Sequence, residues 1–518
     1  MSPLLYGLCR RLFQILAGGL LGTNLGLLKI CFALLSRRFL PSRGTLFPAL
    51  ADTGLSEAAA RRSGVALRTG QWNLAQLLAA WRKCFQTEGH FRRHAYEGYH
   101  PVAVDLVGFF GSHLQGPVGR HYTSQAGKAL PAMVFGMAAD IGSVGKTRLP
   151  LLRRLLRQQA DETEPALQAR LLKETARTLH KNEMLVTDAG FSLADLLDNT
   201  PTAFVTRLDQ NVTARRNRLP EYKGRGARPK FGEIVRPLAR TYVGRKLAAT
   251  APDATARWKA GKHRVKAWIF EDLVLSTARP GSTPFRIVVI KDPRYPKPLV
   301  LAANRKLTAY ALWCLYRDRW PVEQMPLCAK QMLGCERAFV FGDQSRWRLP
   351  ELAMLAGNLL SYVAACSQPV ATGFWDRCAR PTSGRLRRML ARLSFSDLPL
   401  WAGQFRKKDS PTAHLPKGVD AHRRQKRTIT AGSQTVSCQY SGDTIKSVRR
   451  WVRRIRRLLQ SKGTKSAKRH LKRLRQKQSR FTRNTNHVIS KRLVVAGTAT
   501  RAIARARTSS FAFNVASR

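Results

Sequence analysis

Four residues between Tyr316 and Lys330 have types and a spacing that could do chemistry on a phosphate. Arg319, Glu323 and Lys330 follow Tyr316 at offsets of 3, 7 and 14 residues. On a helix that turns by roughly 100° per residue, they lie about 60°, 20° and 40° from the tyrosine, on one side. A carboxylate flanked by two cations and a phenol can hold a metal ion while its neighbours hold phosphate. A solvated helix face with i,i+4 charge pairs is the alternative interpretation.

The pattern Y-x2-R-x3-E-x6-K resembles the signature of DDE transposases of the Y-R-E-K insertion-sequence type and fits at all four positions. The resemblance implies that Glu323 is the third metal-binding carboxylate of an RNase H-like nuclease core. It also implies that Tyr316, Arg319 and Lys330 contact the transposon end. Pro321 lies inside the pattern, and proline lacks an N–H and clashes one turn back, so we expect the helix to begin or kink there.

Two aspartates occupy positions that suit the same chemistry. Asp105 lies in the middle of the apolar, β-rich run 101–110. A charged carboxylate in a buried strand is unfavourable unless something binds it, and a metal or backbone donors would serve. Asp188 ends the predicted strand 184–188 and resembles the second-aspartate motif of the same family. We therefore predict that Asp105, Asp188 and Glu323 are catalytic and bind two Mg²⁺ ions, for which Mn²⁺ can substitute, because Mg²⁺ prefers oxygen ligands.

Asp188 and Glu323 are 135 positions apart in sequence, which is too far for one loop. The resemblance implies a mainly β insertion there, at about 210–305, in which Trp258 and Trp268 are more typical of core residues. The basic, glycine-rich run 222–231 is typical of an arm that enters a minor groove or of a disordered linker. Asp140 stands where a phosphate-binding loop needs glycine, which argues against an NTPase. We predict an amphipathic helical stretch over 148–182 and a helix over 349–365.

The charge balance points to a polyanionic partner. The chain has 518 residues, with 91 Lys and Arg against 31 Asp and Glu, a formal net charge of +60. Nucleic acid would offset the self-repulsion of such a fold, and its binding should weaken steeply with salt. Double-stranded DNA at transposon ends and target is the predicted partner, with a homodimer in the synaptic complex and no membrane. An anionic membrane surface and a ribosomal or chromatin-like packing role are the competing interpretations.

Cysteine usage favours a reducing compartment. Nine cysteines are scattered without a CxxC pair, which argues against a disulfide framework or a zinc ribbon. His90 and His94, four residues apart and near Cys84 and His100, have a spacing that zinc can use, but ordinary polar roles are the commoner explanation. We expect a cytoplasmic, bacterial-type protein associated with the nucleoid.

The N-terminal region, 1–98, is predicted to be helical and DNA-binding. Residues 12–28 carry no charge but contain polar residues and glycines, which favours short packed helices over a membrane span. Ser56 is a predicted helix N-cap, the pair Ser63–Gly64 is expected to end that helix, and a second helix should begin at Asn73. Helix, short turn and helix suit a helix-turn-helix, or equally an ordinary helical hairpin.

The C-terminal sequence resembles a different family from the rest of the chain. Residues 429–518 resemble the RuvC-like region of TnpB nucleases, in the YSG, LQSKGTKSAKR and NHVISKR stretches. The resemblance implies an aspartate before YSG and a glutamate after ISKR, yet 428–437 and 494–518 contain no acid. We therefore expect two basic helices joined at Lys462–Gly463, in a non-catalytic fragment that binds nucleic acid, and a tail after Val495 that does not fold.

Together these features predict an α/β protein with an RNase H-like mixed sheet flanked by helices. The predicted domains are a helical region at 1–98, the DDE catalytic domain at 99–370, a linker and helical extension at 371–428, and the TnpB-like fragment. The predicted function is metal-dependent cleavage and strand transfer of insertion-sequence ends, by in-line attack of water and of a 3′-hydroxyl on phosphodiesters. The alternative is a catalytically decayed transposase that only binds DNA or RNA.

Overall fold

The computed structural model describes residues 3–17, 23–110, 114, 118–124, 126–198, 202–222, 224, 227–336, 342–369, 371, 373–397, 428–432, 437–441, 443–462, 464–495 and 503–506. The chain forms two compact units, residues 1–419 and 420–518. The predicted linker at 371–428 falls partly outside the described residues, as do Lys223 and Arg225 of the glycine-rich arm.

A mixed sheet of 13 strands organises the first unit, in the order β1-β4-β2-β6-β7-β15-β14-β13-β8-β9, with β3 and β5 also on β4 and β12 on β13. Strands β2, β6 and β7 are parallel, whereas β4 is antiparallel to β2 and β15 is antiparallel to β7. The strands are β1 (Phe91–Arg93), β2 (His100–Phe110), β3 (Gly119–Thr123), β4 (Lys128–Val144), β5 (Thr147–Arg157), β6 (Glu183–Thr187), β7 (Ala203–Leu208), β8 (Ala214–Arg216), β9 (Ile234–Val235), β12 (Ala254–Ala260), β13 (His263–Leu275), β14 (Phe285–Lys291) and β15 (Leu299–Ala303). This α/β arrangement, a large mixed sheet flanked by helices, is compatible with the predicted RNase H-like fold.

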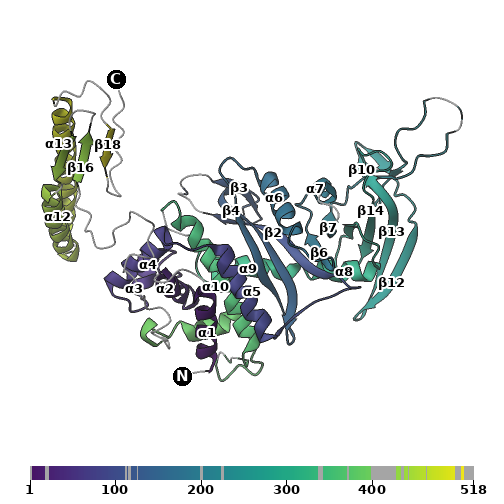
Figure 1. The fold of residues 1–518 in the computed structure, drawn as a ribbon, viewed down its shortest axis with the longest axis horizontal. Helices are drawn as coiled ribbons and strands as arrows, with labels where there is room; N and C mark the ends of the chain where they lie inside the picture. Colours follow the sequence, from purple (N-terminus) through teal and green to yellow (C-terminus); the bar gives the residue numbers. More distant parts are fainter. Residues whose placement is uncertain are drawn as a thin grey trace. The chain divides into compact units, whose positions relative to one another are not determined.

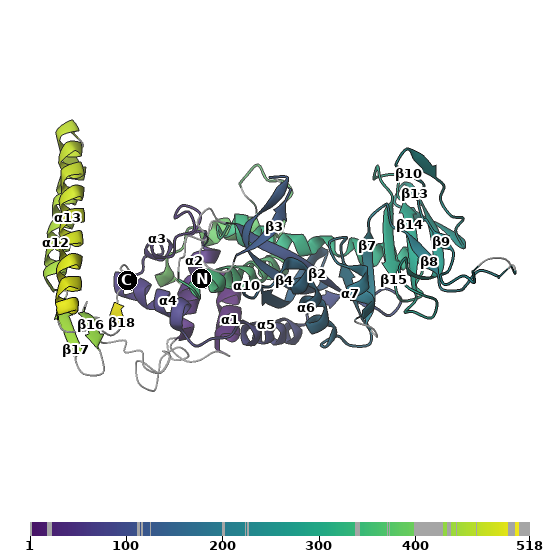
Figure 2. The ribbon, with the colours of Figure 1, turned by 90° about the horizontal axis from the view of Figure 1, so that it is seen from above.

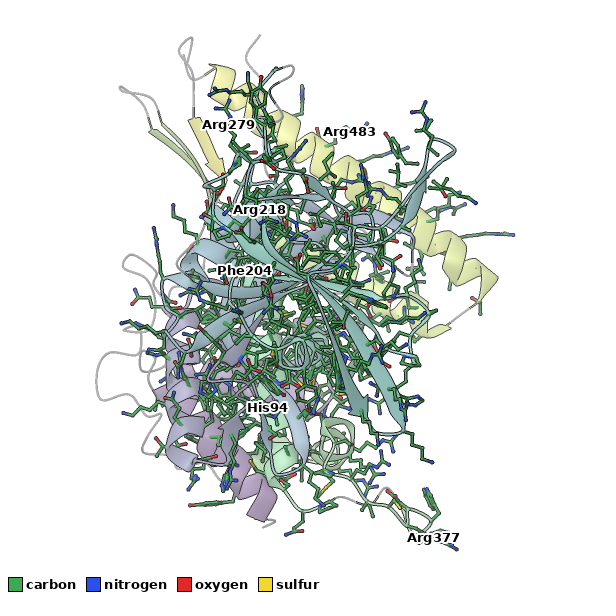
Figure 3. All side chains as sticks on the ribbon, turned by 90° about the vertical axis from the view of Figure 1, so that its right-hand side faces the viewer. His94, Phe204, Arg218, Arg279, Arg377 and Arg483 are labelled. Atoms are coloured by element: carbon green, nitrogen blue, oxygen red, sulfur yellow. The ribbon has the colours of Figure 1, made fainter. Side chains whose placement is uncertain are left out.

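Helices cover both faces of the sheet (Figure 1). On one face α6 (Glu164–Ala176) and α7 (Leu193–Asp198) enclose an apolar core that includes Phe204, labelled in Figure 3. On the other face α8 (Ala309–Arg317) packs against β6, β7 and β14. Next to it, α10 (Ser345–Cys366) and the N-terminal helices share one core with β2, β4 and β5.

The N-terminal helices are part of this unit and do not form a core of their own. They are α1 (Pro3–Ala17), α2 (Thr23–Leu35), α3 (Leu46–Ala51), α4 (Glu57–Thr69) and α5 (Leu74–Glu88). Asn358 of α10 accepts a hydrogen bond from the buried indole of Trp81 at 2.9 Å and another from the Leu152 N–H of β5 at 3.0 Å. The predicted boundary near residue 98 therefore separates stretches of sequence and not two compact bodies.

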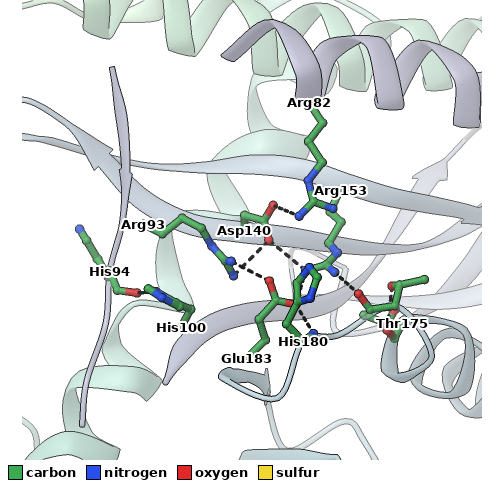
Figure 4. A network of polar contacts seen from close by, with 10 residues as sticks. Arg82, Arg93, His94, His100, Asp140, Arg153, Thr175, His180 and Glu183 are labelled. Carbon is green, nitrogen blue, oxygen red and sulfur yellow. Dashed lines mark hydrogen bonds and ion pairs between the residues drawn. The ribbon is translucent and has the colours of Figure 1, made fainter. Parts of the chain in front are cut away.

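A buried ion network joins four strands of the sheet and reaches α5 through Arg82 (Figure 4). The Arg153 guanidinium lies 3.2 Å from the Asp140 carboxylate and 2.8 Å from that of Glu183. Arg93 of β1 pairs with Glu183 at 2.6 Å, and Arg82 of α5 approaches Asp140 at 4.0 Å. Asp140 thus pairs with arginines inside β4, and the run that follows it continues β4 to Val144 and turns at residues 145–146 into β5, so it is not a phosphate-binding loop.

Two local predictions are wrong. Residues 147–157 form strand β5, whose leucines are buried against α5 and α10, so pairing with β4 overrides the helical pattern of Leu and Arg. Helix α4 continues through Ser63–Gly64. The glycine there allows close packing, because a Cβ on Gly64 would lie only 2.9 Å from the Phe47 ring. The predicted caps at Ser56 and Asn73 are confirmed by hydrogen bonds from Ala59 and Ala75.

The region of the predicted insertion consists mainly of strands. Strands β8 to β15 lie within 214–303, with a separate hairpin of β10 (Arg240–Tyr242) and β11 (Arg245–Leu247). These strands extend the central sheet, because β15 pairs with β7. Figures 1 and 2 place them at the opposite end of the sheet from the N-terminal helices. Trp258 packs against Trp313 of α8 at 5.7 Å between ring centroids, as a core tryptophan would.

After α8 the chain forms a 3₁₀ turn (Trp320–Glu323), α9 (Gln324–Leu327) and a π-turn (Cys328–Met332), and after α10 it forms α11 (Ser383–Leu390) and a 3₁₀ turn (Phe395–Asp397). Among the described residues, α10 has the length and composition of a membrane span, but 83% of its apolar window is buried inside the protein. The predicted short helices near the N-terminus are present as α1 and α2, and both are largely buried.

The second unit contains the predicted pair of basic helices. These are α12 (Asp443–Lys462) and α13 (Lys465–Val495), beside a sheet of β16 (Thr428–Gly432), β17 (Ser437–Ser441) and β18 (Ile503–Ala506). The helices carry 19 Lys and Arg against one acid, Asp443. Apart from β18, the tail after Val495 lies outside the described residues.

Candidate functional site

One predicted aspartate, Asp105, lies on β2, and the other, Asp188, comes directly after the adjacent parallel strand β6. Ala103 of β2 is opposite Val186 of β6, and continuing this register by two residues brings Asp188 alongside Asp105. Asp188 directly follows β6, and its carboxylate accepts a hydrogen bond from the Gly190 N–H at 3.0 Å, which fixes the turn. The sheet therefore holds these two carboxylates side by side, as the strand predictions required.

Arg319 joins this pair to the third predicted acid. Its guanidinium donates to Asp105 at 3.2 Å through Nη1 and to Glu323 at 3.0 Å through Nη2. Arg319 is 5% exposed, and its guanidinium lies over the Tyr316 ring at 5.6 Å. Glu323, in contrast, has 59% of its side chain exposed. One buried cation thus holds two of the acids, and the electrostatic influence of Asp188 also reaches it.

The electrostatics of Asp105 are those of a crowded acidic site. Burial and the neighbouring Asp188 carboxylate raise the pKa of Asp105 to about 7, against the opposing effects of Arg319 and the Leu106 N–H. Burial lowers the pKa of Arg319, but its anionic neighbours outweigh this and raise it. A site that makes an aspartate hard to ionise favours the binding of a cation beside it.

The four signature residues do not share one helical face. Helix α8 ends at Arg317, and Pro321 is the second residue of a short 3₁₀ turn that begins at Trp320, so the continuous helix assumed from the spacing is absent. The break is at the proline, as its missing N–H predicts.

Two signature residues do not contact the acids: Tyr316 is buried, and Lys330 lies against two phenylalanine rings. Tyr316 is 2% exposed, and its hydroxyl has no hydrogen-bond partner among the described residues. Lys330 lies in the π-turn, with its ammonium 5.3 and 5.4 Å from the ring centroids of Phe109 and Phe110 at the far end of β2. Burial lowers the pKa of Lys330 to about 8. Their contacts with DNA stay predictions.

A buried aspartate that the sequence analysis missed holds the signature segment in place. Asp318 is 1% exposed and accepts hydrogen bonds from His94 at 2.5 Å, from the Tyr96 hydroxyl at 2.6 Å and from Arg148 at 3.1 Å. It lies between α8 and Arg319, so it ties this turn to the β1–β2 connection and to β5. The sequence offered one signal, a carboxylate inside an otherwise basic and apolar stretch.

The donor chemistry of the site suits a hard divalent cation, although the carboxylates do not converge on one point. Within the described ranges, no three His, Cys, Asp or Glu side chains are grouped as a metal site, and this includes Asp105, Asp188 and Glu323. Arg319 keeps Glu323 paired on the Asp105 side. The oxygen-only set of Asp105 and Asp188 fits Mg²⁺, and Glu323 could join it once Arg319 releases it.

The zinc alternative has no support in the described residues. His94 is paired with Asp318, and the Nδ1 of His100 contacts the His94 carbonyl oxygen at 2.7 Å. The Cys84 thiol donates to Gln14 at 3.1 Å, and burial raises the pKa of this thiol to about 11. These side chains serve as packed polar groups.

Comparison with known proteins gives little beyond this. No protein-family model and no curated protein matches the sequence. Among solved structures, the chain is similar to piggyBac transposase in a synaptic complex with hairpin DNA, at 12% sequence identity and a TM-score of 0.33. The alignment covers 76% of this chain and 77% of that one. At this TM-score the likeness assigns neither family nor function.

Proposed function

We propose that this protein is a DDE-type DNA transposase that cleaves and joins phosphodiesters at the ends of an insertion sequence. The observation that carries the proposal is that Asp105 on β2 lies close to Asp188, which directly follows the parallel strand β6, with Arg319 linking Asp105 to Glu323. Arg319 and Asp105, 214 positions apart in sequence, are joined by a hydrogen bond. A solvated, charge-paired helix face would not bury Arg319 against an aspartate of another strand.

Each residue has a proposed role. Asp105 and Asp188, joined by Glu323, would hold two Mg²⁺ ions, which Mn²⁺ can replace. When bound, the ions would supply charge stabilisation for in-line attack on a phosphodiester. Arg319 is the group that can transfer from the acids to a DNA phosphate, because its planar guanidinium suits either partner. Glu323, already exposed, would then be released toward the aspartates.

The remaining signature residues would act around this centre. The Lys330 ammonium lies beside Phe110. Phe110 is five residues along β2 from Asp105, a distance on the order of 16 Å, so Lys330 would bind a phosphate away from the cleaved bond. Tyr316 would orient Arg319 from behind. The homodimer, the nucleoid location and the kinship of the Tyr316–Lys330 segment to the Y-R-E-K type belong to the same proposal.

The second unit is proposed to bind nucleic acid without chemistry of its own. Its two long helices carry many cations and one acid, which suits a phosphate backbone and not a carboxylate-based metal site. Its kinship to TnpB remains part of this proposal. A protein that only binds DNA or RNA is the rival function for the whole chain.

A nicking assay decides between the two. Supercoiled plasmid that carries the DNA flanking the gene would be incubated with the full chain and Mg²⁺, with EDTA as control. We expect nicks at defined positions only when the metal is present. If the plasmid stays intact while the protein binds it, the binding-only function is correct.

A further inference from the structure

A row of like charges crosses strands β12, β13 and β14. In the sheet order, β14 is four positions away from β2, the strand that holds Asp105. Arg257 of β12 is directly opposite Lys266 of β13, and Lys266 is directly opposite Lys291 of β14. We name these three residues the cation row. Lys259 and Arg264 form a second opposed pair, two residues further along β12 and β13.

The register fixes which way these side chains point. Residues opposite one another in an antiparallel sheet share a face, and residues two apart on a strand share it too. All five cations are exposed. Val289, two residues before Lys291, contributes to the core beneath α6 and α7, whereas Ile290 contributes to the core beneath α8. The cations therefore lie on the sheet face opposite α8 and the Arg319 turn.

Nothing in the described part of the chain neutralises these charges. No ion pair or hydrogen bond of the five side chains to an acid occurs there, and residues 254–266 contain no Asp or Glu. The nearby acids are already paired: Asp253 with Arg216, Glu271 with Arg286 and Asp292 with Arg294. Like charges directly opposite one another destabilise a sheet, so folding alone does not account for the arrangement.

Protection of a sheet edge explains only part of it. Lysine on an edge strand prevents pairing with other chains, and β12 is such an edge. Lys266 and Lys291 lie on interior strands, each with a neighbour on both sides. Their charges therefore have another purpose.

We propose that the cation row, with Lys259 and Arg264, is a binding surface for the phosphate backbone of duplex DNA. Cations about 5 Å apart across the strands and about 7 Å apart along them present a flat grid to a ridge of closely spaced phosphates. A membrane surface fits less well, because binding there relies on exposed aromatic and aliphatic side chains. Among the described residues, none of the exposed large apolar side chains lies on β12, β13 or β14.

The proposal deepens the proposed function by assigning the DNA contact to a place that takes no part in the chemistry. Because the sheet separates this surface from Asp105 and Asp188, it should set affinity and salt dependence and leave the rate of cleavage of bound DNA unchanged. It rests on the proposed function only for the choice of DNA as the polyanion.

The test compares two variants of the full chain that lose the same charge. One is Arg257→Gln/Lys266→Gln/Lys291→Gln. The control is Lys173→Gln/Arg177→Gln/Lys181→Gln, three exposed cations on and just after α6. Fluorescence anisotropy with a labelled mixed-sequence duplex, in EDTA and across a salt series, gives the dissociation constants. Thermal unfolding checks the fold, and the first variant should be at least as stable as the wild type because its opposed charges are gone.

We expect the first variant to bind the duplex at least about tenfold more weakly at physiological salt. The slope of log K against log[salt] should shrink by up to about 2.7, at about 0.9 per lost phosphate contact. The control should keep the wild-type slope. An equal change in both variants would overturn the proposal, as would unchanged DNA binding with loss of binding to phosphatidylserine vesicles. If the wild type never nicks DNA but the first variant alone loses affinity, this surface stands and the proposed chemistry fails.

Discussion

At the scale of single residues, the site is a balance between three carboxylates and one guanidinium. Asp188 is close enough to disfavour the charge of Asp105, and Arg319 offsets this effect on Asp105. Glu323 is attached to the same arginine at 3.0 Å. In the proposed function, Arg319 is the group that exchanges partners when phosphate or a cation binds.

Arg319→Gln tests this balance. Without the guanidinium, Asp105 loses a buried partner beside Asp188, so we expect the metal-free protein to lose roughly 2–3 kcal/mol of stability. The penalty stays below that of a fully buried pair because Glu323 is largely exposed. Chemical denaturation measures the loss, and Mg²⁺ should raise the unfolding temperature of the variant more than that of the wild type. Equal Mg²⁺ effects would show that Arg319 does not compete with a cation.

Lys330→Met should reveal a pH-dependent term in stability. Because burial lowers the pKa of Lys330 to about 8, the folded state releases this proton before the unfolded state, whose lysine titrates near 10.4. The unfolded chain then binds more protons between these values, so the wild type gains stability as pH rises from 8 to about 10. The variant lacks this term, and the difference in unfolding free energy between the two should change across that range. A constant difference would mean that Lys330 is ordinarily solvated.

At the scale of elements, the turn after α8 positions the site. Pro321 forces a short 3₁₀ turn where the spacing alone suggested a continuous helix. Asp318, just before that turn, is held in place by hydrogen bonds from His94, Tyr96 and Arg148. The positions of Arg319 and Glu323 therefore depend on the hydrogen bonds of Asp318 to the β1–β2 connection and to β5.

Asp318→Asn should weaken cleavage more than DNA binding. The neutral side chain loses its charge-assisted bonds to His94 and Arg148, at a cost of roughly 2–3 kcal/mol in stability. Tyr96→Phe is the matched mild variant, since it removes one hydrogen bond and should cost about 1 kcal/mol. Single-turnover nicking and duplex binding are measured side by side. A fall in binding as large as the fall in nicking rate would indicate a general loss of fold instead of a displaced Arg319.

The strands were predictable because their residues state both burial and direction. The apolar run at 101–110 lies in β2, and the predicted strand 184–188 corresponds to β6 (Glu183–Thr187). Asp105 stands out within the first because a charge there needs a partner. Strand β5 was not predictable, since its Leu and Arg pattern fits a helix and only pairing with β4 makes it a strand. The Asp318 contacts span more than 160 residues, and no local pattern reports contacts of that range.

At the scale of the whole molecule, the chain divides its tasks between two compact units. Residues 1–419 hold the sheet, the acids and the cation row, and residues 420–518 hold the basic helical pair. Neither α12 nor α13 offers more than one carboxylate. The proposed chemistry therefore belongs to the first unit, and the second adds positive charge.

A chain that ends at Val419 should keep metal-dependent nicking. We expect its affinity for mixed-sequence DNA to fall and its salt dependence to become shallower, because many phosphate contacts leave with α12 and α13. Plasmid nicking at low salt and anisotropy across a salt series measure the two effects. Loss of nicking by a truncated chain that still folds and binds DNA would place part of the active site in the second unit.

The central claim is that Asp188, beside Asp105, belongs to a metal-dependent cleavage centre. Asp188→Asn keeps the size of the side chain and an oxygen that can accept from the Gly190 N–H, so the fold should survive. The decisive measurement is the single-turnover nicking rate of this variant in Mg²⁺, alongside its dissociation constant for the same DNA. The account predicts that the rate falls by at least about 100-fold, equivalent to about 2.7 kcal/mol, while the dissociation constant changes little. A variant that nicks DNA at the wild-type rate would contradict it.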